Sequence, residues 1–135
     1  MAKTDKPTPA SVLLDTHALI WWCTADRRLG PNARRSIESS RTRVVVSAAS
    51  AWEIATKVRL GRLAWGASES LEAYCHGQGF SLLPVSFAHA ELAGAWESDH
   101  GDPFDRMLAA QSRIERIPLV TNDALLRAFG VETLW

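Results

Sequence analysis

Four acidic residues stand where a carboxylate could do chemistry, because each of them follows an apolar run or opens a helical pattern. They are Asp15, Glu53, Asp105 and Asp123. Carboxylates that lie close together raise one another's pKa, and a divalent cation removes the cost of that repulsion. An all-oxygen ligand set selects a hard ion such as Mg²⁺ or Mn²⁺. Such a site favours metal-assisted hydrolysis, and a phosphodiester is its natural substrate.

Each acid also has a purely structural explanation. Asp15 and Asp123 could be helix N-caps that accept a backbone N–H. The segment Ser50–Glu53 has the form of a capping box. The segment 102–105 has the form of an N-cap aspartate followed by proline and a first-turn acid. For any one acid the cap is the stronger explanation, and it is the placement of all four together that favours a metal site.

Short β-branched runs alternate with longer helical patterns along the chain. The expected strands are 12–14, 44–46, 80–85, 118–121 and 131–135, and the expected helices are 16–24, a basic helix within 27–40, 47–60, 67–76, 86–97, 104–115 and 124–129. This alternation predicts βαβ units, which form a parallel sheet with helices on both faces. Ligands of such sheets bind outside the carboxyl ends of the strands, which is where three of the acids fall. Asp105 reaches this edge if its helix starts there.

The length of 135 residues argues for one domain. We place it at residues 12–135, after a flexible tail at 1–11 that has no signal-peptide core. No apolar run approaches the roughly 20 residues of a membrane span, so no membrane partner is expected. Cys23 and Cys75, without a secretory signal, favour reduced thiols in a cytoplasmic protein.

Charge is unevenly distributed although the formal net charge is zero. Residues 27–62 hold nine Lys or Arg and two acids, whereas residues 63–105 hold seven acids and no Lys or Arg. Arginine, which outnumbers lysine twelve to three, suits forked recognition of phosphate. Residues 27–62 are therefore the predicted path of an RNA backbone, with solvated helix faces as the alternative.

Around the four acids the sequence resembles the PIN-domain family, and within it the VapC-type toxins of bacterial toxin–antitoxin pairs. The matching stretches are Leu13–Trp21, Ser47–Ala55, His100–Gln111 and Leu119–Asp123, together with the closing Val131–Trp135. No single motif is decisive, but four of them in order and with compatible spacing are specific. The resemblance covers nearly the whole chain from Val12 onward.

The resemblance implies an α/β fold, a three-layer α/β/α sandwich with a central, mainly parallel sheet of four to five strands. It implies an endoribonuclease that depends on Mg²⁺ or Mn²⁺ and blocks translation, with tRNA as one plausible substrate. It also implies a homodimer and an inhibitory antitoxin protein. By position, Asp15 and Asp105 bind the metal directly, while Glu53 and Asp123 act partly through water. The motif holds two aspartates, and their spacing from the run 108–110 assigns catalysis to Asp105 and the cap to Asp102.

Other side chains near the acids are candidates for supporting roles. Polar residues that could orient carboxylates, or only cap local backbone, are Thr16, Ser47, Ser50 and Asn122. Arg106 could contact a substrate phosphate, neutralise the acids or form an ordinary ion pair. His17 and His100 are expected to have surface roles, and Trp52 is expected in the core.

Other functions are weaker on this sequence. A phosphatase of the haloacid-dehalogenase type needs a second aspartate two residues after its first, where this chain has His17. A receiver domain needs a lysine near its last strands, and no lysine follows Lys57. A non-catalytic PIN-like binding module, acting through a protein partner with its acids as caps, stays open as the alternative.

Overall fold

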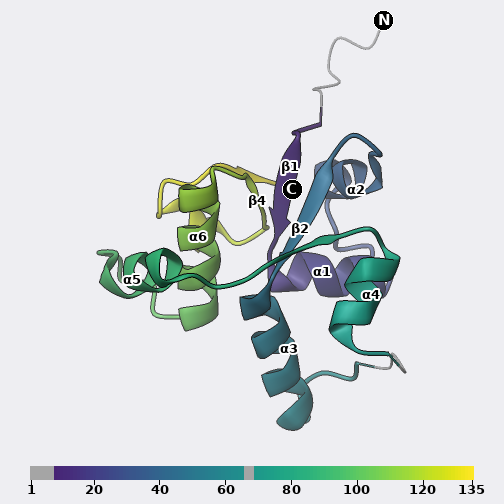
Figure 1. The fold of residues 1–135 in the computed structure, drawn as a ribbon, viewed down its shortest axis with the longest axis horizontal. Helices are drawn as coiled ribbons and strands as arrows, with labels where there is room; N and C mark the ends of the chain where they lie inside the picture. The colour runs from purple at the N-terminus through teal and green to yellow at the C-terminus, as the bar shows by residue number, and fades with distance from the viewer. Residues whose placement is uncertain (1–7, 66–68) are drawn as a thin grey trace, which may run out of the picture.

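A single parallel sheet forms the centre of the computed structural model, which describes residues 8–65 and 69–135 (Figure 1). Its strands are β1 (Ser11–Leu14), β2 (Arg43–Ser47), β3 (Ser81–Leu83), β4 (Leu119–Val120) and β5 (Thr133–Leu134). They lie in the order β3-β2-β1-β4-β5, and every pairing is parallel. The expected parallel sheet of four to five strands is confirmed.

Helices cover both faces of the sheet. They are α1 (Thr16–Cys23), α2 (Pro31–Glu38), α3 (Ala48–Arg59), α4 (Leu71–Gly77), α5 (Phe87–Ala95), α6 (Pro103–Glu115) and α7 (Ala124–Arg127). Figure 1 shows α1, α2 and α4 on one side of the strands and α5 and α6 on the other. The expected three-layer sandwich is therefore confirmed. Residues 1–7 of the expected tail and the start of the expected helix 67–76 lie outside the described residues.

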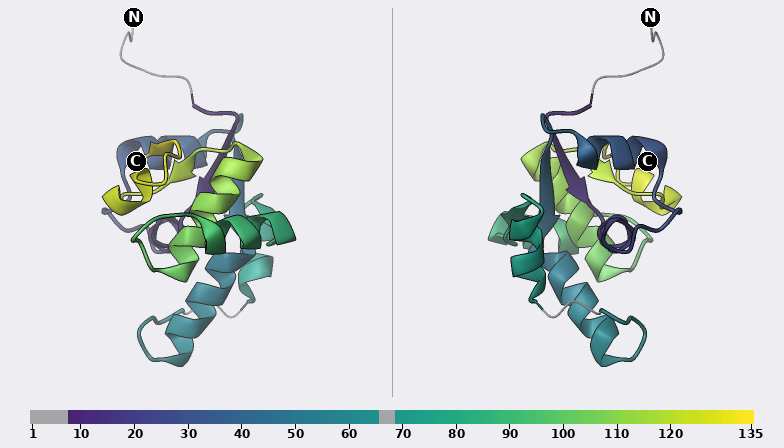
Figure 2. Two further views of the ribbon diagram at one scale, coloured as in Figure 1. Left: turned by 90° about the vertical axis from the view of Figure 1, so that its left-hand side faces the viewer. Right: turned by 90° about the vertical axis from the view of Figure 1, so that its right-hand side faces the viewer.

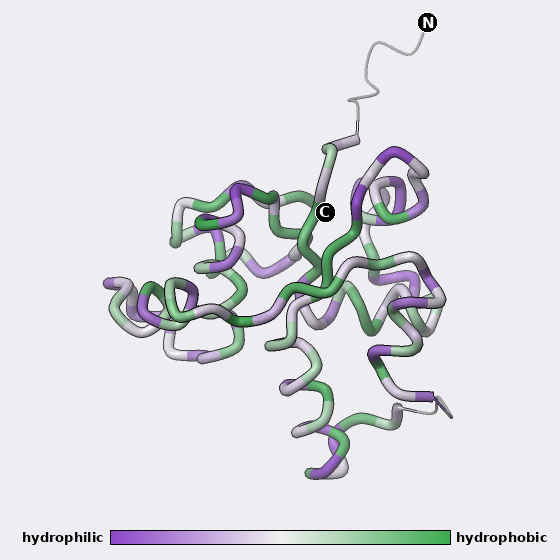
Figure 3. The backbone as a smooth tube through the Cα atoms, viewed as in Figure 1, coloured by the Kyte–Doolittle hydropathy of each residue, from purple (hydrophilic) through white to green (hydrophobic). Residues whose placement is uncertain are grey.

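The central strands are apolar along their whole length because both of their faces are buried. Leu14 and Val46 belong to the cluster that α1 and α2 cover, whereas Leu13 and Val45 belong to the cluster that α6 and α7 cover. Successive side chains of a strand point to opposite faces, so one short run supplies both cores. Figure 3 shows this apolar stretch at the centre of the molecule.

The central strands end level with one another. Leu14, the last residue of β1, pairs with Val46 of β2 and with Val120 of β4. The next residue, Asp15, donates its backbone N–H to the Val120 carbonyl at 3.0 Å. From this edge α3 extends away from the sheet (Figure 2). The segments that follow β1, β2 and β4 therefore begin side by side at the carboxyl edge of the sheet.

The structure also bears on two expectations, one about Trp52 and one about membrane-spanning helices. Trp52 is 65% exposed on α3, so its expected place in the core is wrong. It contacts Phe104 instead, with the two ring centroids 4.9 Å apart. Among the described residues, none of the helices combines the length and the hydrophobicity needed to span a membrane.

The C-terminal residue closes the fold against the start of α2. The carbonyl of Trp135 accepts the Asn32 N–H at 3.2 Å. A Cβ atom added to Gly30, the N-cap of α2, would lie 2.5 Å from Cδ1 of Trp135 and 2.6 Å from its backbone carbon. Gly30 is thus required for close approach, since its φ of −66° is open to any residue.

We predict that Gly30→Ala destabilises the protein by about 1 to 3 kcal/mol, because the added methyl group must displace Trp135. Gly94→Ala is the matched control, since Gly94 lies within α5 and an added Cβ there meets nothing within 4 Å. It should stabilise by up to about 1 kcal/mol through helix propensity. Urea unfolding of both variants measures the difference. Equal effects of the two substitutions would contradict the close contact.

Candidate metal centre

A hollow of about 280 Å³ at the carboxyl edge of the sheet is lined by all four acids singled out in the sequence. Its lining also includes Asp102, His17, Thr56, Lys57, Leu60, Arg62 and Phe104. Asp15 comes from the end of β1, Glu53 from α3 and Asp105 from the first turn of α6. Asp123 follows β4 and caps α7. Residues more than a hundred positions apart thus face one space.

Asp15 is the most constrained of these carboxylates. It is 6% exposed, and its Oδ1 accepts the Ala18 N–H at 2.7 Å as the N-cap of α1. Burial raises the pKa of Asp15 to about 6, although hydrogen bonds from Thr121 and Ala18 act in the opposite direction. The negative charge of Asp105 adds to the increase in pKa. An ionised Asp15 is therefore costly unless a cation balances it.

Asp105 lies against a histidine, His100, for which the sequence had suggested only a surface role. Nε2 of His100 is 2.9 Å from Oδ2 of Asp105, and the His100 side chain is 13% exposed. Burial raises the pKa of Asp105, and the hydrogen bond with His100 lowers it. One sequence signal could have indicated this contact. The Asp102-Pro103 cap turns the chain just before α6, which brings residues preceding the cap close to the first turn of the helix.

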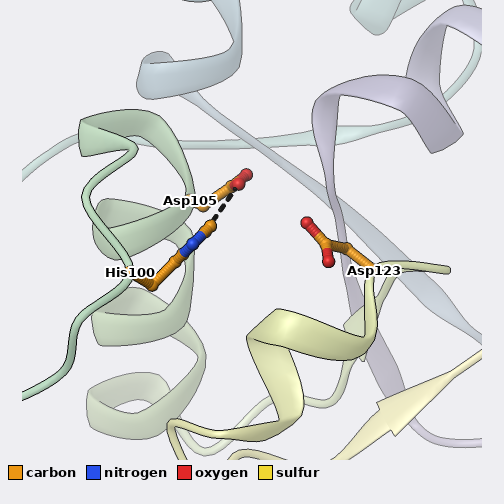
Figure 4. Close-up of side chains that lie close together, drawn as sticks. All are labelled: His100, Asp105 and Asp123. Atoms are coloured by element: carbon orange, nitrogen blue, oxygen red, sulfur yellow. Dashed lines mark hydrogen bonds and ion pairs between the residues drawn. The ribbon is translucent and has the colours of Figure 1, made fainter.

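Asp123 completes a group of three possible ligands with these two residues. Its Oδ1 accepts the Leu125 N–H at 2.9 Å, which fixes the carboxylate as the cap of α7. One ligand atom each from His100, Asp105 and Asp123 lies within 4.8 Å of the others, which is close enough for one ion to contact all three. Figure 4 shows the three side chains converging from the loop, α6 and the start of α7.

Glu53 is buried and paired with a lysine. It is 7% exposed, and its Oε2 lies 2.9 Å from Nζ of Lys57, one helical turn further along α3. The capping-box alternative for Glu53 is wrong, because Ser47 is the N-cap and Ser50 lies inside the helix. Lys57 belongs to the predicted basic window, and its i,i+4 spacing from Glu53 is the sequence signal that could have predicted this ion pair.

The neighbouring polar residues mostly hold the elements in place. Ser47 accepts the Ala49 N–H at 3.0 Å, and the buried Thr16 hydroxyl donates to Ser50 at 3.1 Å, which links α1 to α3. Asp102 caps α6 by accepting the N–H groups of residues 104 and 105 at 2.9 and 3.0 Å. Asn122 is exposed and does not line the hollow.

Arg106 points away from the acids. Its guanidinium donates to the carbonyls of Ala93 at 2.8 Å, His100 at 2.7 Å and Ser98 at 3.2 Å, and also to that of Trp96. These bonds attach the loop before α6 to the helix. Among the roles that the sequence left open for Arg106, the structure thus adds a structural one, and Arg106 does not line the acidic hollow.

The basic window 27–62 is divided between two places. Lys57 and Arg62 line the acidic hollow, whereas Arg27, Arg34 and Arg35 line a separate hollow beside α2. Helix α2 leads back to the start of β2, so its end lies toward the amino edge of the sheet (Figure 1). Of the predicted phosphate path, Lys57 and Arg62 are thus the part that lies beside the acids.

Comparison with known proteins agrees with the geometry. Residues 12–131 match the family model of the PIN domain. No curated protein sequence gives a match. Among solved structures, VapBC2 from Rickettsia felis, bound to a DNA fragment from its promoter, aligns with a TM-score of 0.67 and 13% identity, covering 93% of this chain and 98% of that one.

Two further structures have a similar fold. VapBC-1 from nontypeable Haemophilus influenzae has a TM-score of 0.64. A toxin–antitoxin complex from Klebsiella pneumoniae has a TM-score of 0.63. Each is 17% identical and covers 92% of this chain and 96% of the other. At these identities the likeness concerns the fold, and the family model spans nearly the whole described domain. The chain belongs to the PIN domain family.

Proposed function

We propose that this PIN domain is an endoribonuclease that depends on Mg²⁺ or Mn²⁺. The observation that carries the proposal is the meeting of Asp15, Glu53, Asp105 and Asp123 in one hollow. Two of them, Asp15 and Glu53, are less than a tenth exposed. Burying several carboxylates together is unfavourable, because each loses its hydration and their negative charges repel one another. A catalytic cation accounts for their assembly.

The residues present fit a hard divalent ion. The acids offer oxygen atoms, and the raised pKa of Asp15, about 6, marks a carboxylate that gains from a nearby positive charge. Asp15, Asp105, Asp123 and Glu53 are the residues that would hold the ion. When bound, such an ion activates water for attack on a phosphodiester and stabilises the leaving oxygen. The N-caps of α1 and α7 keep two of the carboxylates oriented beforehand.

Cationic side chains at the rim of the hollow favour a polyanionic substrate. Lys57 offsets the charge of Glu53, with 2.9 Å between nitrogen and oxygen. Arg62 lines the same hollow just beyond the end of α3, and its guanidinium suits a phosphate group. RNA is the substrate that we propose, with tRNA as one plausible form.

We further propose that the protein is the toxin of a toxin–antitoxin pair. The solved relatives include VapBC assemblies and a toxin–antitoxin complex, which supports an antitoxin partner. A groove of about 410 Å³ between α3, α5 and α6 offers an apolar surface that includes Trp52, Val85 and Met107. Phe87 at the start of α5 is 90% exposed. Such an apolar surface suits a protein partner. A homodimer stays a prediction from the resemblance.

The non-catalytic binding module would use the same groove, so activity and metal binding have to separate the two functions. We expect purified protein, freed of antitoxin, to cleave structured RNA with Mg²⁺ or Mn²⁺ and not with EDTA. Asp15→Asn and Asp105→Asn should each lower the rate by at least about a hundredfold, because each removes a charged ligand. Asp102→Asn is the matched control, since asparagine keeps the cap of α6.

Gel analysis of cleavage time courses tests these variants together. Retained activity in both Asp15→Asn and Asp105→Asn would contradict the proposed site. An equal loss of activity in Asp102→Asn would show that the cap residue Asp102 is as essential as Asp105. Absence of cleavage in every form, with no change in melting temperature on adding Mn²⁺, would favour the binding module.

A second prediction concerns the stability of the metal-free protein. The pKa of Asp15 is about 6 when folded and 3.8 as the ordinary value. The folded state therefore binds this proton more tightly than the unfolded state. As a result, the free energy of unfolding falls as the pH rises from below 3.8 to above about 6. At neutral pH the cost is about 2 to 3 kcal/mol. In EDTA, Asp15→Asn should recover much of this free energy at about pH 7 and little at about pH 4.

Chemical denaturation of the wild type and Asp15→Asn at the two pH values measures this difference. Asparagine retains the acceptor for the Ala18 N–H, so loss of the cap does not obscure the result. A destabilised Asp15→Asn protein at about pH 7 in EDTA would show that the buried charge is already balanced within the chain.

A third prediction uses the divided basic window. Arg62→Ala should weaken the binding of labelled structured RNA about threefold to tenfold and reduce its salt dependence, because one phosphate contact is lost. Arg35→Ala, in the separate hollow beside α2, should leave both quantities unchanged. Fluorescence anisotropy in an Asp105→Asn background avoids cleavage. A larger effect of Arg35→Ala would place the RNA along α2 instead.

A further inference from the structure

His100 belongs to a loop, yet its position is fixed from several sides. Its backbone N–H donates to the Ser98 hydroxyl at 3.2 Å, and its carbonyl accepts from Nη1 of Arg106 at 2.7 Å. Its ring lies edge-on to the buried Phe129, with 5.9 Å between the ring centroids. These contacts hold the imidazole beside Asp105, with the His100 side chain only 13% exposed.

The fixed ring presents a nitrogen to the carboxylates. Nε2 of His100 lies 2.9 Å from Oδ2 of Asp105, and a ligand atom of Asp123 completes the group of three. Figure 4 shows the imidazole and the two carboxylates facing the same space. His17, by contrast, lines the hollow but is not part of this group and is exposed. Within the described part of the chain, His100 is therefore the histidine whose ring nitrogen lies close to two carboxylates at once.

A nitrogen ligand changes which ion a site prefers. Mg²⁺ is held by carboxylates, carbonyls and waters and dehydrates reluctantly. First-row transition-metal ions, of which Mn²⁺ binds most weakly, also accept imidazole. We propose that His100 is a ligand of the cation held by Asp105 and Asp123, and that it selects Mn²⁺ or a later first-row ion over Mg²⁺. This inference rests on the acidic metal site of the proposed function.

The competing explanation is that His100 only orients Asp105 through the hydrogen bond. A purely orienting histidine would place a carboxylate for either ion, so its loss would weaken Mg²⁺ and Mn²⁺ binding alike. Loss of a ligand would weaken Mn²⁺ binding far more than Mg²⁺ binding. In addition, bound Mn²⁺ would transfer unpaired electron density to the nitrogen of a histidine that coordinates it. The two roles therefore differ in measurable binding and spectroscopic properties that do not involve catalysis.

The experiment compares Mn²⁺ binding by the wild type, His100→Gln and His76→Gln, the last at an exposed α4 residue that does not line the hollow. Glutamine can still donate a hydrogen bond to Asp105 but offers no imidazole nitrogen. Electron paramagnetic resonance of free Mn²⁺ gives the Mn²⁺ affinity, and competition gives that of Mg²⁺. We expect His100→Gln to weaken Mn²⁺ binding about tenfold or more and Mg²⁺ binding much less. His76→Gln should change neither affinity.

Pulsed resonance of the bound Mn²⁺ decides the role directly. The coupling of a bound imidazole nitrogen should be present in the wild type and in His76→Gln and absent in His100→Gln. Bound Mn²⁺ without nitrogen coupling in the wild type would overturn the ligand role, even if His100→Gln failed to fold. If the wild type binds no Mn²⁺ at all, the metal site of the proposed function fails as well. Binding and RNA cleavage without nitrogen coupling would leave that function intact.

Discussion

The level ending of three parallel strands is the constraint on which the site depends. Leu14 pairs with both Val46 and Val120, so the residues after β1, β2 and β4 emerge side by side. Burial of these apolar strands on both faces stabilises the fold. The same burial takes the Asp15 carboxylate out of water and raises its pKa to about 6. The core therefore supplies the free energy that brings mutually repelling groups together, and the site depends on the sheet for its assembly.

Much of this arrangement follows from local sequence signals. The run of three valines at 44–46 has no polar alternation, which predicts a strand covered on both faces. An acid placed directly after such a strand, as Asp15 is, must lie at the carboxyl edge whatever the rest of the chain does. Asp102-Pro103 predicts the start of α6, and that start places Asp105 in the first turn. Strand ends and helix starts are encoded within a few residues, which is why the four acids could be identified together.

The features that the sequence did not predict depend on contacts between distant segments. The position of His100 requires Phe129, almost thirty residues later, and the loop that Arg106 attaches to α6. Trp52 is 65% exposed on α3, which extends away from the sheet (Figure 2), and its ring contacts Phe104 of α6, which lies about fifty residues later. The basic window 27–62 is continuous in sequence but crosses the sheet, since α2 leads to the amino end of β2 and α3 leaves from its carboxyl end. No local pattern contains this information.

The choice between cap and ligand, which the sequence leaves open for each aspartate, is resolved differently along the chain. Asp102 also lines the hollow but is exposed and accepts two backbone N–H groups as the cap of α6, whereas Asp15 and Asp123 are less exposed and each accept one backbone N–H as caps. Each of these two caps uses Oδ1, and the cap does not require the second oxygen of the carboxylate. A capped carboxylate has lost its rotational freedom during folding, so binding a cation costs little further ordering. In the proposed metal site, capping and ligation by Asp15 and Asp123 would therefore support each other, because each cap orients its carboxylate before an ion binds.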